Sequence, residues 1–241
     1  MNMQTTRRIA AVSMAGAATL AIAGFTALGS IFEYPQILKA STDEILAAYR
    51  ENQAAISGWF LVLAIGAALL APVGILLGRI AGGTLGRWIA GVGIAGATVQ
   101  VIGLSRWVLL IPGVSEDATV PALAADARHT FELLHFWLGT IVGETIGYAL
   151  TATFTVLVVI ALSGSVAPRW LGYLGYAAAA LIATGVLIPL GLGAASLSNF
   201  AGYIAWCLWL IGMAIALWRA QRALPPAKTS DTGKRASSAN S

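Results

Sequence analysis

Six long runs of apolar residues, separated by short polar segments, dominate this sequence. The runs are continuous and rich in Ala, Leu, Gly and Ile. They lack the alternation of apolar and polar residues that marks the strands of a membrane barrel. About 20 apolar residues in a helix cross the hydrocarbon core of a bilayer. We therefore predict membrane-spanning helices at residues 9–32, 57–78, 88–112, 131–162, 171–192 and 200–218.

Composition supports this class of protein. Hydrophobic residues make up 58% of the 241 residues and charged residues only 10%, whereas soluble domains are about 25% charged. The sequence therefore predicts an all-α, polytopic bundle of six helices over residues 1–223, followed by a disordered cytoplasmic tail at 224–241. Little length remains for a soluble catalytic domain. The single cysteine, Cys207, excludes a disulfide framework.

The distribution of charge predicts how the chain is threaded. Lys and Arg in short loops mark the cytoplasmic side of a membrane. Basic residues precede the first helix, lie between helices two and three and between four and five, and follow helix six, whereas the alternate segments are rich in acids. We therefore expect both termini in the cytoplasm. The basic residues are Arg7, Arg8, Arg79, Arg87, Arg169, Arg219, Arg222, Lys228, Lys234 and Arg235.

The segment between helices one and two contains its own helix signal, "STDEILAAYRENQ". Ser41 or Thr42 can cap a short helix whose first turn is acidic. Ile45, Leu46 and Tyr49 would then share one face, which we expect to lie on the membrane interface or on other loops.

A line of polar residues interrupts the fourth apolar run. At 100° per residue, the side chains of this line fall within a narrow stripe on one face of an α-helix. A row of glycines beside the stripe should let another helix approach closely. The stripe comprises Glu144, Tyr148, Thr151 and Thr155, and the glycines are Gly139, Gly143 and Gly147.

Glu144 needs a partner if it is buried, and Arg106 in helix three is the candidate. Counting about 1.5 Å per residue along each helix, the two residues lie at similar depths, both displaced from the centres of their helices toward the outer face. An unpaired charge at the centre of a bilayer costs about 2.5–3.5 kcal/mol even on insertion scales. We therefore predict a buried Arg106–Glu144 ion pair, which is either a structural clamp between two helices or part of a substrate or proton site.

A second candidate site lies at the outer start of helix four, where His129, Glu132 and His135 are spaced three apart. Offsets of three and six residues spread the side chains over 120° of a helix, so a shared metal is not expected. On the same reckoning, His135 lies about 180° from Glu144 and should not join that site. Haem held between two helices would need a further histidine, and retinal would need a membrane-embedded lysine. The sequence therefore predicts no cofactor.

The order and spacing of five segments resemble a family of small bacterial six-helix membrane proteins described only as a domain of unknown function. The segments are "DEILAAYR", "LSRWVLLIPG", "FELLHFWLGTIVGETIGY", "PRWLGYLG" and "AGYIAWCLWL". The resemblance extends over nearly all of residues 7–220 and implies a multi-pass protein of the bacterial plasma membrane, without implying an activity. The residues that match characteristic positions of that family are Arg106, Trp107, His135, Glu144 and Tyr148.

The function most consistent with these features is non-enzymatic: binding or moving a small molecule or lipid through a polar site between helices three and four. Six helices are few for a lone transporter, so we expect a homo-oligomer in the lipid bilayer. The sparse basic residues of the tail do not predict binding to nucleic acid. Two alternatives stay open: an intramembrane enzyme using His129, Glu132 and His135 at the outer face, and an accessory or assembly subunit without chemistry of its own.

Overall fold

The structure of the protein is a computed structural model that describes residues 1–222. The predicted tail at 224–241 lies outside these residues. The described chain is helical, and six of its helical segments are long and apolar enough to cross a membrane. The protein is therefore an all-α, multi-pass membrane protein, as the apolar runs predict.

Several of the six spans are built from more than one helical element. The first span is α1 (Met3–Phe32), and the second joins α3 (Gln53–Ala68) to α4 (Leu70–Ala81). The third joins α5 (Gly83–Leu109) to α6 (Ile111–Asp117), and the fourth joins α7 (Ala124–Leu134), η2 (His135–Ile146) and α8 (Gly147–Leu162). The fifth joins α9 (Arg169–Ala183) to η3 (Thr184–Leu190), and the sixth is α10 (Gly193–Arg222).

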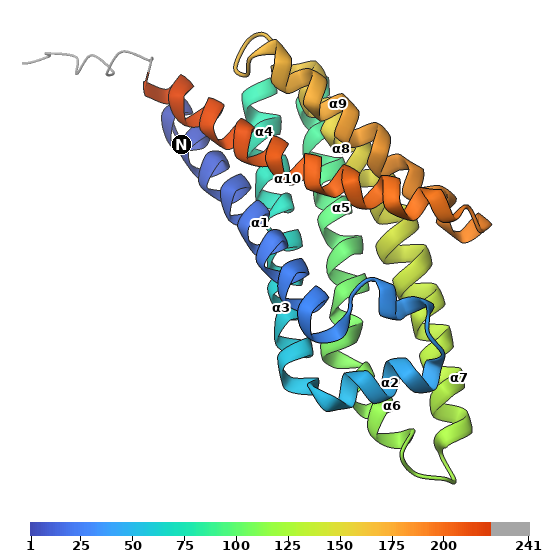
Figure 1. Cartoon of the computed structure of the whole chain (residues 1–241). Coiled ribbons are helices and arrows are strands. Elements are labelled where there is room, and N and C mark those ends of the chain that lie inside the picture. Colours follow the sequence, from blue (N-terminus) through green and yellow to red (C-terminus); the bar gives the residue numbers. More distant parts are fainter. Residues whose placement is uncertain (223–241) are drawn as a thin grey trace, which may run out of the picture.

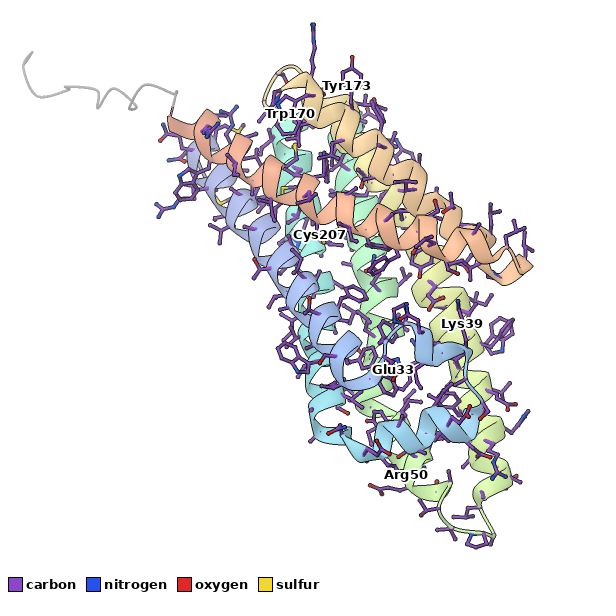
Figure 2. All side chains as sticks on the ribbon, in the orientation of Figure 1. Glu33, Lys39, Arg50, Trp170, Tyr173 and Cys207 are labelled. Atoms are coloured by element: carbon purple, nitrogen blue, oxygen red, sulfur yellow. The ribbon has the colours of Figure 1, made fainter. Side chains whose placement is uncertain are left out.

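Both ends of the described chain lie at the same end of the bundle, which we call the terminal end (Figure 1). The guanidinium of Arg7 donates to the backbone carbonyl of Ala220 at 3.1 Å, and Arg8 lies 5.4 Å from the ring of Trp218. Figure 2 shows Trp170 and Tyr173 at this end too, where both are exposed. This arrangement agrees with an even number of spans.

The opposite end carries a folded loop, residues 33–52, which we call the hook. The hook contains η1 (Gln36–Lys39) and α2 (Thr42–Glu51) and lies across α5 and the fourth span (Figure 1). Ser41 caps α2 in a capping box with Glu44, as the sequence predicts. Because Ser41 donates hydrogen bonds from its backbone N–H and its hydroxyl to the carboxylate, the pKa of Glu44 is lowered.

The hook is anchored by its aromatic and aliphatic residues rather than by the membrane interface. Ile45, Leu46 and Tyr49 are buried, and the hydroxyl of Tyr49 donates to the carbonyl of Trp107 at 2.9 Å. Trp107 is stacked on Phe60 with ring centroids 4.9 Å apart. We call this packed group the aromatic cluster; its rings belong to Phe32, Tyr34, Tyr49, Phe60, Trp107 and Phe131.

Two helical segments depart from the α-helices expected from the sequence, and one α-helix begins earlier than expected. Residues 135–146 form a π-helix, in which each turn contains one more residue than an α-turn. The fifth span changes to a 3-10 helix at Thr184, before Pro189. The sixth helix begins at Gly193 rather than at 200, so it includes the buried Asn199, whose side-chain amide donates to the carbonyl of Ile182 at 2.8 Å.

Candidate functional site

Arg106 lies near the end of α5 and is buried, with only 4% of its surface exposed. One guanidinium nitrogen, Nη1, donates to the carbonyl of Gly103 in its own helix at 2.5 Å. The guanidinium carbon lies 5.3 Å from the centroid of the Trp107 ring, which is within cation–π range. The other terminal nitrogen, Nη2, is buried without a hydrogen-bond partner. Arg106 therefore has an unused donor inside the bundle.

Glu144 lies on η2, half-buried, and the ion pair predicted between it and Arg106 is not formed in the structure. Within residues 1–222, the ion pair present joins Arg128 to Asp43 at the surface. Glu144 and Arg106 are close enough to interact electrostatically without direct contact. The Arg106 guanidinium instead interacts with its own helix, through a hydrogen bond to the Gly103 carbonyl and a cation–π contact with the Trp107 ring.

The glycines of the fourth span face α5, as their spacing predicts. A Cβ built on Gly139 would lie 2.7 Å from Nη2 of Arg106, and one built on Gly143 would lie 3.0 Å from the Cα of Gly103. A Cβ on Gly147 would lie 3.4 Å from the side chain of Gln100. The row therefore brings η2 against α5 and gives the Arg106 guanidinium the space in which it lies.

The structure places His135 within electrostatic range of Arg106, and its π-helix departs from the uniform α-helix on which the expected separation of His135 from Glu144 depends. That expectation assumed 100° per residue, whereas in a helix with hydrogen bonds five residues apart an offset of nine is close to two turns. His135 interacts electrostatically with Arg106, and its ring is stacked on Phe131 at 5.8 Å. Its Nδ1 atom is buried without a hydrogen-bond partner.

The two threonines of the predicted stripe, Thr151 and Thr155 on α8, take part in packing between helices. Thr151 accepts a hydrogen bond from the amide of Gln100 at 2.8 Å, and Thr155 accepts one from the indole of Trp206 at 2.8 Å. Both hydroxyls therefore have partners on neighbouring helices. Tyr148 packs edge-on against Tyr203 of α10, with ring centroids 5.7 Å apart.

Tyr34 of the hook also belongs to this region, although it lies about 70 residues or more from Arg106 and Glu144 in the sequence. Burial raises the pKa of its hydroxyl well above the usual value. The carboxylate of Glu144 raises it further, and the guanidinium of Arg106 opposes this effect. Tyr34 is thus within electrostatic reach of both charges.

We call the assembled group the polar cluster. It lies where the aromatic cluster meets the apolar core nearer the terminal end, and it draws on the hook, α5, the fourth span and α10. Its members are Tyr34, Arg106, His135, Glu144, Tyr148 and Tyr203.

The structure does not bring His129, Glu132 and His135 together. His129 is exposed, and Glu132 is exposed and accepts a hydrogen bond from Thr42 of the hook at 3.2 Å. His135 faces inward instead. In the described part of the chain, no three His, Cys, Asp or Glu side chains are grouped as a metal site would need.

Sequence reasoning missed Tyr34, Gln100, Tyr203 and Trp206. Gln100 carried a usable signal, because it is an uncharged polar residue inside an apolar run and so needs a partner there. The aromatic residues carried none, because tyrosine and tryptophan are also the ordinary residues of membrane interfaces.

A comparison with models of known protein families identifies the family of this chain. The family model described as "Domain of unknown function (DUF4386)" matches residues 9–214. The chain belongs to this family. The matched region begins in α1 and ends in α10, so it includes every residue of the polar cluster. The resemblance noted in the sequence is confirmed. Comparisons with curated proteins and with solved structures gave no match.

Proposed function

We propose that this DUF4386 protein binds a small polar molecule or a lipid headgroup at the polar cluster and moves it when the bundle changes conformation. The observation that carries the proposal is the unpartnered Nη2 of Arg106, which is buried between α5 and η2.

A purely structural role would favour a different arrangement. Burial of an ionised side chain costs several kcal/mol unless its hydrogen bonds are satisfied. A clamp between helices would satisfy this need by joining Arg106 directly to Glu144. Two groups of opposite charge that lie near each other without pairing are better suited to contact a third group.

The position of the cluster suggests how a ligand would be exchanged. Tyr34 and the rest of the hook cover the cluster from one end of the bundle. Tyr148 and Tyr203 pack against the apolar core at the other. Exchange in either direction would therefore need movement of the hook or separation of α5 from η2.

We also propose that the protein lies in the bacterial plasma membrane with both termini in the cytoplasm. The basic residues Arg7, Arg79, Arg87 and Arg169 support this orientation, because they lie near the start of α1 or beside the short loops that join α4 to α5 and α8 to α9. The hook, with acids such as Glu33, would then face outward.

A thermal-stability screen tests the binding proposal. Purified protein in mild detergent is heated with polar metabolites and with lipids of different headgroups. A ligand at 100 times its Kd should stabilise the native state by about 2.7 kcal/mol. We expect at least one compound class to raise the Tm of the wild type and to lose that effect in Arg106→Gln.

Arg87→Gln is the matched control, because Arg87 lies on the same helix but is exposed and donates a hydrogen bond to the hydroxyl of the exposed Thr84. It should respond to ligands like the wild type. The proposal is wrong if no compound stabilises the wild type, or if Arg106→Gln keeps the whole response while remaining folded.

A further inference from the structure

The two ends of the polar cluster differ in charge and in surroundings. At one end, the guanidinium of Arg106 presents Nη2 into the space left by Gly139. The buried Nδ1 of His135 also lacks a partner and is within electrostatic range of Arg106. A guanidinium with a free N–H matches an acceptor that carries negative charge, such as a carboxylate or a phosphate.

The other end is acidic and aromatic. Glu144 lies within electrostatic range of three tyrosines, each from a different element: Tyr34 of the hook, Tyr148 of α8 and Tyr203 of α10. The Tyr148 and Tyr203 rings meet edge to face. A carboxylate in these surroundings matches a cation such as an ammonium group, because the carboxylate accepts hydrogen bonds from its N–H groups.

We propose that the ligand of the polar cluster is a zwitterion, with its anionic group on Nη2 of Arg106 and its ammonium group on Glu144 among the three tyrosines. This inference rests on the proposed function and narrows it to a class of ligand.

The physical basis is charge compensation inside a medium of low dielectric constant. A ligand with one charge would pair one protein group and leave the other uncompensated, which is strongly unfavourable in a buried site. A ligand with both charges pairs Arg106 and Glu144 at once. The cluster therefore selects against simple anions and simple cations.

Two kinds of molecule share this chemistry. Soluble amino acids carry a carboxylate and an ammonium group, and zwitterionic phospholipids carry a phosphate and an ammonium group in their headgroups. Because the proposed charges are common to both kinds of molecule, the experiment has one arm for each.

In the first arm, binding to detergent-purified wild type is measured by calorimetry. The zwitterions are glycine, β-alanine, 4-aminobutyrate and phosphoethanolamine, and their halves are acetate, inorganic phosphate and ethylammonium. In the second arm, the protein is placed in nanodiscs that contain phosphatidylethanolamine, phosphatidylcholine or phosphatidylglycerol, and retained lipid is measured by native mass spectrometry.

We expect at least one zwitterion to bind at least tenfold more tightly than either of its halves, or zwitterionic lipid to be retained over anionic phosphatidylglycerol. Binding of that zwitterion should fall at least tenfold in Glu144→Gln and in Arg106→Gln, but not in Arg87→Gln. The comparison of zwitterion with halves uses the wild type alone, so it stands even if a variant does not fold.

The inference is overturned if an anion alone binds as tightly as any zwitterion and binding does not depend on Glu144. The proposed function would then survive, because a ligand would still bind at Arg106. If no zwitterion binds but other compounds stabilise the protein through Arg106, the inference again fails alone. Failure of every compound in both experiments refutes both.

Discussion

The contact between α5 and η2 can be tested by adding a single methyl group at Gly103. A Cβ at this position would lie 2.7 Å from the Cα of Gly143 and 3.0 Å from the carbonyl oxygen of Leu138. Carbon atoms in contact lie about 3.5–4.0 Å apart, so the two helices would have to separate by about 1 Å. Neither neighbour can turn aside, because both are backbone atoms.

The expected cost of Gly103→Ala follows from this geometry. Overpacking of a well-packed interior costs about 1–3 kcal/mol. Replacing Gly by Ala also favours the helix by about 1 kcal/mol, which would hide part of the loss. Gly91→Ala in the same helix removes this ambiguity, because a Cβ there meets nothing within 4 Å. The difference between the two variants should therefore be about 1–3 kcal/mol.

The assay uses the single thiol of the protein. Cys207 on α10 is half-buried, so a thiol-reactive fluorescent dye reports unfolding during heating. Each kcal/mol lowers the Tm of a protein of this size by about 2–4 °C. Gly103→Ala should melt clearly below Gly91→Ala. Equal melting temperatures would mean that the helices do not meet at Gly103 and Gly143, and the placement of the polar cluster would have to be abandoned.

Three further variants test the surroundings of the cluster. Trp107→Ala should lower stability by about 3–5 kcal/mol, since a fully buried indole is lost from the aromatic cluster; a thermal melt that matches the wild type would contradict that packing. Ser41→Ala should cost about 0.5–2 kcal/mol through loss of the capping box, visible as faster amide exchange at the start of α2; unchanged exchange there would count against the cap. Tyr34 has a raised pKa in the folded state, so its contribution to stability is complete below about pH 10, the unfolded value, and is lost as the pH rises above it. Tyr34→Phe should therefore make the Tm less sensitive to pH between about 9 and 11, and an unchanged slope would place Tyr34 in water.

Much of the fold could be predicted because hydrophobicity and capping act over short distances. The six spans follow from the length of each apolar run. The hook helix follows from Ser41 and Glu44, which satisfy each other's backbone within one turn. The sequence also predicts that the glycine row of the fourth span faces another helix, because residues without side chains, such as Gly139 and Gly143, let a neighbouring helix approach closely.

The candidate site was only partly predictable. The calculation that placed His135 opposite Glu144 depended on a uniform α-helix, and a π-helix changes the angular position of every residue within it. The predicted ion pair assumed that the Arg106 side chain extends toward its neighbour, whereas Gly103 and Trp107 in its own helix hold it. Tyr34 reaches the cluster only because the hook folds back, and that path depends on tertiary contacts rather than on local sequence.

If Arg106 and Glu144 form a ligand site rather than a clamp between helices, the purified protein should carry a bound ligand that depends on both residues. Native mass spectrometry of protein released from mild detergent tests this most directly. We predict that the wild type and Arg87→Gln retain the same bound small molecule or lipid, and that folded Arg106→Gln and Glu144→Gln have lost it. Identical spectra from all four proteins, with or without a bound species, would contradict this prediction.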